Sequence, residues 1–125
     1  MSKVFKLGVY RLGDENIRVY ASASYRNSSC RSDQCSGDMP LMCCKLPKQW
    51  GHTVAECVHE AMEWSMLRRD CCWVRHNAIR ASSDAYSYTL DHGRLDDVAG
   101  DVGMFITDVL PELAKAWKKS QKTAK

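Results

Sequence analysis

Hydrophobic and polar residues alternate over the first part of the chain, which is rich in Val, Ile and Tyr. Two alternating runs, residues 4–12 and 17–24, are separated by a short segment that contains Gly13, Asp14 and Asn16. A period of two places apolar side chains on one face of a strand, and such a segment is typical of a tight turn. The pattern predicts an N-terminal β-hairpin.

Further along, the apolar spacing changes to one typical of helices. Residues 52–69 form a first helical run, and Arg68 and Arg69 at its end suit the negative pole of a helix dipole. A second run keeps the helical period through Leu95, Val98, Val102, Phe105, Val109 and Leu113. We expect Pro111 to kink or restart this helix, because proline lacks a backbone donor and crowds the preceding turn.

The remaining segments have weaker periodicity. Residues 27–47 combine Ser, Asp, Gly and Pro with four cysteines, a composition typical of a loop or a small irregular insert. Residues 72–79 and 85–90 contain enough aromatic and β-branched residues for short strands or extended segments.

These segments predict one α+β domain over residues 1–125. In it, an N-terminal β-hairpin and one or two further short strands pack on two main helices. Residues 26–48 would form a Cys-rich loop or insert, and residues 118–125 a basic C-terminal tail. A chain of 125 residues suits one domain with a modest core.

The composition is that of an ordinary globular protein, with 45% hydrophobic and 26% charged residues. No apolar stretch approaches the length of a membrane span, and residues 1–10 lack the apolar core of a secretory signal. We therefore expect a cytoplasmic protein. Its seven cysteines would remain thiols there unless they bind metal, so disulfides are not expected.

The net charge of +3 arises largely from lysines near the C-terminus, namely Lys115, Lys118, Lys119, Lys122 and Lys125. A solvated helix end explains such a cluster better than a nucleic-acid site does. The four tryptophans also lack a spacing suited to stacking bases. We expect neither a nucleic acid nor a membrane as partner. Oligomeric state stays open.

A polar stripe on the first helix carries the candidate chemistry. His52, Glu56, His59 and Glu63 follow one another at spacings of four, three and four, which places them on one helix face. A solvated face would ordinarily carry Lys and Arg, yet residues 51–67 contain neither. The stripe therefore favours a metal site or a catalytic site.

A hydrolytic zinc site needs two or three ligands, an open position for water and a nearby carboxylate that accepts a proton. His59 and Glu63 are four residues apart, so both can reach one ion from the same helix face. Glu60, one residue round the helix, is then the expected general base. His52 lies about 10 Å from His59 along the axis, so it does not join this pair.

The third ligand must come from another element. His92 is the best candidate, because it lies at the entrance to the second helix between Asp91 and Gly93. Asp96 and Asp97 in the first turn of that helix are alternative ligands, although the helix dipole also explains carboxylates there.

This layout resembles the small zinc metallopeptidases common in phage genomes, which are similar to pared-down gluzincins. The resemblance covers residues 50–119 in layout, and only His59 and Glu60 match by residue type. The family motif is His-Glu-x-x-His, with zinc on both histidines, glutamate as the base and a third ligand near or in the following helix. The resemblance implies a peptidase-like hydrolase that acts on a peptide or protein substrate, located in the host cytoplasm if phage-encoded. Glu63 departs from the motif, since it replaces the second histidine.

A non-catalytic interpretation also stays open. His59 and Glu63 also suit an ordinary ion pair on a solvated helix. The protein would then be a non-catalytic accessory or inhibitor protein that binds another protein, and any metal it holds would be structural.

The cysteines form a second candidate metal site. Four of them, Cys30, Cys35, Cys43 and Cys44, have the number and softness of zinc ligands. Their spacing is unfavourable, because adjacent residues of an extended chain point in opposite directions. Buried or reactive thiols are the preferred interpretation. Cys57, on the apolar side of the first helix, is expected in the core.

Overall fold

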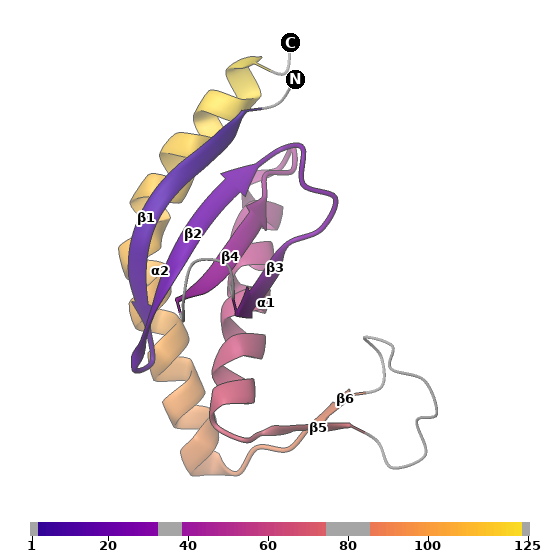
Figure 1. Cartoon of the computed structure of the whole chain (residues 1–125), viewed down its shortest axis with the longest axis vertical. Coiled ribbons are helices and arrows are strands. Elements are labelled where there is room, and N and C mark those ends of the chain that lie inside the picture. Colours follow the sequence, from indigo (N-terminus) through magenta and orange to yellow (C-terminus); the bar gives the residue numbers. More distant parts are fainter. Residues whose placement is uncertain (1–2, 33–38, 75–85, 124–125) are drawn as a thin grey trace.

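The computed structural model describes residues 3–32, 39–74 and 86–123. It has an α+β fold in which a four-stranded mixed sheet packs on two helices, as predicted (Figure 1). The elements are β1 (Val4–Leu12), β2 (Glu15–Ser22), β3 (Ser29–Ser32), β4 (Pro40–Lys45), α1 (Trp50–Arg68), β5 (Cys72–Val74), β6 (Tyr86–Tyr88) and α2 (His92–Thr123).

The N-terminal hairpin is confirmed. β1 and β2 pair antiparallel, and Leu12 lies opposite Glu15, so only two residues form the turn. The first of these, Gly13, has a φ of 66°, a left-handed conformation that glycine adopts without steric cost. The pairing register shifts between Lys6 and Gly8, which marks a β-bulge in β1.

The prediction of a loop or small irregular insert over residues 27–47 is wrong for residues 29–32 and 40–45, which are two strands of the main sheet. β4 pairs parallel with β2 on one side and antiparallel with β3 on the other, which gives the strand order β1-β2-β4-β3. Pro40, Met42 and Cys44 alternate with partly exposed residues, so β4 follows the period of a half-buried strand. The alternation was not recognised in the sequence, because the segment is rich in polar and cysteine residues, which are typical of loops.

Both helices cover the same face of the sheet (Figure 1). Apolar side chains from that face and from the two helices form one core, in which Phe105 of α2 is fully buried and meets the ring of Tyr10 edge-on at 6.4 Å. Cys57 of α1 is fully buried, as predicted. Other core members are Leu7, Leu12, Ile17, Val19, Ala21, Met42, Cys44, Ala61, Trp64, Val98, Val102, Val109 and Leu113.

α2 runs through Pro111 without a break, so the predicted restart does not occur. Val109 and Leu113 on either side of the proline are fully buried, and their packing holds both halves of the helix on the sheet. The predicted basic tail is also helical as far as Thr123, and Lys118 and Lys122 are exposed on its last turns.

β5 and β6 pair antiparallel as a separate ribbon that projects away from the main sheet (Figure 1). The sequence predicted short strands over residues 72–79 and 85–90, and each contains one of these strands. Residues 75–85 lie outside the described part of the chain. The further strands of the main sheet therefore come from the segment before α1 and not from the one after it.

Candidate metal site

α1 turns the predicted stripe away from the core. Cys57, Ala61 and Trp64 are buried against the sheet, whereas His52 is exposed and the His59 side chain is 64% exposed. With 3.6 residues per turn, positions 57, 61 and 64 share one side and positions 52, 59 and 63 share another. The apolar spacing of this helix thus determines which side the stripe occupies.

Two side chains of the stripe, His59 and Glu63, come together with the neighbouring Glu60. His59 Nε2 lies 3.1 Å from Glu63 Oε2 and 3.7 Å from Glu60 Oε2. One ligand atom from each residue lies within 4.8 Å of the others. Within the described residues, no other three His, Cys, Asp or Glu side chains meet this closely.

The donor set fits a zinc ion. Imidazole nitrogen and carboxylate oxygen bind zinc at about 2.0–2.2 Å, so two ligands of a tetrahedral site are separated by about 3.3 Å. The two distances from His59 Nε2, 3.1 Å and 3.7 Å, lie on either side of this value. Only small side-chain movements would bring the three donors around one ion.

Glu60 is the least exposed member of the cluster, since its side chain is 10% exposed. Burial and the nearby Glu63 carboxylate raise the pKa of the Glu60 carboxyl above its ordinary value. The backbone of Cys30 in β3 lies near this carboxylate and acts in the opposite direction. The sequence could not predict this neighbour because β3 was assigned to a loop.

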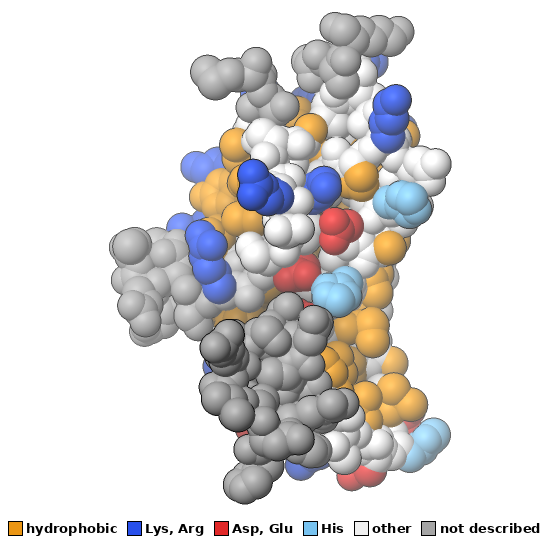
Figure 2. All heavy atoms as spheres, turned by 90° about the vertical axis from the view of Figure 1, so that its right-hand side faces the viewer, with side chains coloured by type: hydrophobic (Ala, Val, Ile, Leu, Met, Phe, Trp, Pro, Cys, Tyr) orange, Lys and Arg blue, Asp and Glu red, His pale blue; other side chains and the backbone are white. Residues whose placement is uncertain are grey.

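A groove of about 590 Å³ runs beside the cluster, between α1 and the ends of β3 and β4. Figure 2 shows acidic and histidine side chains close together on this face, with Lys and Arg side chains beside them. The groove is lined by Asn27, Ser28, Lys45, Pro47, His52, Ala55, Glu56, His59 and Glu60. The stripe is thus one wall of the groove, and the segment that was predicted to be a loop forms the other.

His92 is not part of this cluster. It is the first residue of α2, its side chain is 88% exposed, and its Nε2 atom lies 3.7 Å from Asp96. The start of α2 lies beside the C-terminal end of α1, where Arg94 donates to the Arg69 carbonyl oxygen at 3.0 Å. Arg69 is about 15 Å from His59 along α1, so His92 and the His59 pair lie on separate parts of the surface.

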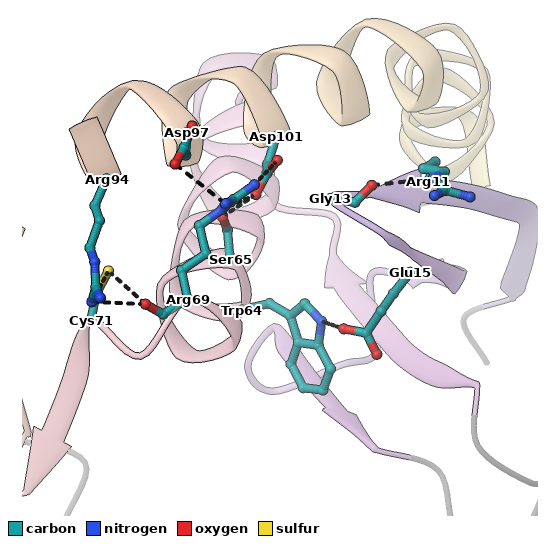
Figure 3. Close-up of polar contacts among 10 residues, drawn as sticks. All are labelled: Arg11, Gly13, Glu15, Trp64, Ser65, Arg69, Cys71, Arg94, Asp97 and Asp101. Atoms are coloured by element: carbon teal, nitrogen blue, oxygen red, sulfur yellow. Dashed lines mark hydrogen bonds and ion pairs between the residues drawn. The ribbon is translucent and has the colours of Figure 1, made fainter.

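Two other carboxylates of α2 contact Arg69 instead of the cluster (Figure 3). Asp97 lies 3.5 Å from Arg69 Nη1, and Asp101 accepts hydrogen bonds from Arg69 Nε at 2.8 Å and from Ser65 Oγ at 2.7 Å. The Arg69 hydrogen bonds hold the pKa of the Asp101 carboxyl below its ordinary value. Asp97, one of the alternative ligands, thus belongs to a network that joins the two helices.

The described cysteines do not converge on a metal site. Cys30 and Cys44 point toward the helices, whereas Cys43 is on the opposite face of the sheet, as expected for adjacent strand residues. Burial and the nearby Glu60 carboxylate raise the pKa of the Cys30 thiol to about 12, so this thiol stays neutral near pH 7. Cys35 lies outside the described residues.

No protein-family model, curated protein or solved structure matches this chain. Across the described segments, neither helix is both long enough and apolar enough to cross a membrane. The chemistry of the cluster and its groove is therefore the starting point for a functional proposal.

Proposed function

We propose that this protein is a metal-dependent hydrolase. In this proposal His59, Glu60 and Glu63 hold a zinc ion at the wall of the groove beside α1. The observation that carries the proposal is the convergence of three donor atoms within 4.8 Å of one another. The spacing of these atoms around His59 Nε2 is close to that of a tetrahedral site.

In this proposal Glu60 takes the place of His92 as the third ligand. One oxygen of Glu60 faces His59, and burial beside the backbone of β3 restricts the movement of the carboxylate. A ligand that is held before the ion arrives loses less conformational entropy on binding. A bound zinc ion would supply Lewis acidity that activates water for hydrolysis.

Glu56 is then the carboxylate left to accept a proton. It lies one helical turn before Glu60, lines the same groove, and is close enough to raise the pKa of Glu60. Lys45 on the facing wall adds a positive charge that can bind a carbonyl oxygen or a carboxylate. A groove open to solvent and lined in this way suits a peptide or protein segment as substrate.

Zinc titration by calorimetry, combined with an assay on a mixture of quenched fluorescent peptides, tests the proposal. We expect wild-type protein to bind one zinc ion per chain and to cleave peptides only when the ion is present. Glu60→Gln should lose both the ion and the activity, whereas Glu56→Gln should keep the ion and lose the activity.

The two variants also separate the possible roles of Glu60. If Glu60→Gln keeps the ion and loses only hydrolysis, Glu60 is the general base that the sequence predicted. If the wild-type protein binds no zinc, the proposal fails, and His59 with Glu63 is an ordinary surface ion pair.

A further inference from the structure

The face of the main sheet turned away from the helices has a distinct composition. Alternate residues of each strand point to this face, because Ile17, Val19 and Ala21 of β2 and Met42 of β4 point into the core. The pairing registers bring together Lys6, Val9 and Arg11 of β1, Asn16, Arg18 and Tyr20 of β2, Leu41 and Cys43 of β4, and Ser29 and Arg31 of β3. We call this surface the open sheet face.

All charged residues on the open sheet face are positive. They are Lys6, Arg11, Arg18 and Arg31, and within the described residues none of them takes part in an ion pair. The four strands contain a single acidic residue, Glu15, and its carboxylate points to the helix side, where it accepts from Trp64 Nε1 at 3.1 Å. The one carboxylate of the four strands thus lies away from the cations of the open sheet face.

Aromatic side chains lie among these cations. Tyr20 is half-buried, pairs in register with Lys6 on one side and with Cys43 on the other, and so occupies the middle of the face. Tyr25, just after β2, is also half-buried and lies near Cys43 and Tyr20, which brings a second ring to this part of the face. Lys6, Arg18 and Tyr20 also line a hollow of about 510 Å³ at the β1 bulge.

We infer that the open sheet face binds single-stranded nucleic acid. Unpaired cations attract a phosphate backbone, and partly exposed aromatic rings provide surfaces on which unpaired bases stack. Duplexes fit less well, because their bases are already stacked and are inaccessible to Tyr20 and Tyr25. An acidic peptide would use the cations but would leave the aromatic rings without a partner.

This binding surface is separate from the metal cluster. The cluster lies on α1, on the other side of the sheet from Tyr20, so either site can be lost without the other. The inference concerns binding only, and it predicts a partner class that the C-terminal lysines alone did not indicate.

Fluorescence anisotropy with single-stranded RNA and DNA of the same sequence, each about twelve nucleotides long, tests the inference. At about 50 mM salt we expect wild-type protein to bind at least one of these strands at least tenfold more tightly than a duplex of equal length or polyglutamate. The logarithm of affinity should fall linearly with the logarithm of salt concentration.

Variants separate the contributions of charge and stacking. Arg18→Gln and Arg31→Gln should each reduce the salt slope by about 0.7, the value for one phosphate contact on a single strand. Tyr20→Leu should weaken binding about tenfold with little change in slope, and Tyr20→Phe should retain wild-type affinity. Lys118→Gln removes one exposed charge from α2 and serves as the matched control.

Three results would overturn the inference. The first is no binding of either single strand by wild-type protein at low salt. The second is equal affinity for the single strands, the duplex and polyglutamate, which would indicate a general polyanion surface. The third is an equal effect of Lys118→Gln and Arg18→Gln, because binding would then depend on net charge and not on this face.

Discussion

Two histidine–carboxylate pairs, one on each helix, differ in their surroundings more than in their spacing. His59 with Glu63 on α1 and His92 with Asp96 on α2 are both four residues apart, with nitrogen–oxygen distances of 3.1 Å and 3.7 Å. The α1 pair has the nearly buried carboxylate of Glu60 beside it and lies on a groove. The α2 pair is 88% and 69% exposed, and no described side chain adds a third donor.

The difference shows what helical spacing leaves undetermined. An exposed pair at i, i+4 contributes only about 0.3–0.5 kcal/mol and requires no ligand. A candidate metal site needs a third donor that the fold holds in place, and here Glu60 is nearly buried beside the backbone of β3. The neighbouring strand therefore distinguishes the two pairs more than the helix does.

Alanine substitution at the two histidines should give the largest difference in zinc affinity between the two pairs. His59→Ala removes one of three ligands and should weaken zinc binding about 100-fold or more, whereas His92→Ala should leave it unchanged. Calorimetric titration of both variants measures the difference. Equal zinc affinity in the two variants would show that neither histidine binds the ion.

A second prediction concerns the α2 carboxylates, which we expect to act on stability alone. Asp101→Asn removes the charge that pairs with Arg69 and should lower the free energy of unfolding by about 1–2 kcal/mol at pH 7, with zinc affinity unchanged. Because Arg69 lowers the folded-state pKa of Asp101, its stabilising effect is present above the ordinary pKa of 3.8 and is lost as pH falls through the folded value. Urea unfolding at several pH values should show the two proteins converging in acid.

The smallest expected effect comes from building the α1 pattern on α2. Gly93→Glu places a carboxylate directly after His92, as Glu60 follows His59, and a Cβ there meets only ordinary contacts. The new side chain would be exposed and would not be buried beside a strand as Glu60 is, so we expect a gain in zinc affinity of no more than about tenfold at α2. Competition with a zinc-sensitive dye measures it in a His59→Ala background. Affinity equal to that of the wild-type cluster would show that the β3 contact adds nothing.

Local patterns predicted much of the fold. The hairpin follows from the alternation around Gly13, and both helices follow from their apolar spacing, because each signal is contained within one element. Residues 27–47 were misassigned because their polar and cysteine residues are typical of loops, although the alternation of Pro40, Met42 and Cys44 was present. Long-range pairing of β4 with β2 turns this weak pattern into a strand.

The candidate site was partly predictable for the same reason. His59, Glu60 and Glu63 belong to one helix, so helical geometry alone brings them together. The choice of His92 as third ligand depended on how α2 crosses α1, and no local pattern contains that information. Likewise, the expectation of no nucleic-acid partner considered only the C-terminal lysines and the tryptophan spacing, since the complete open sheet face exists only when β3 and β4 are strands.

Anomalous diffraction at the zinc edge, from crystals of wild-type protein grown with zinc, tests the central claim most directly. We predict one strong anomalous peak bonded to His59 Nε2 and to carboxylate oxygens of Glu60 and Glu63. A peak at His92 and Asp96 or at the cysteines, or no peak at saturating zinc, would contradict the claim.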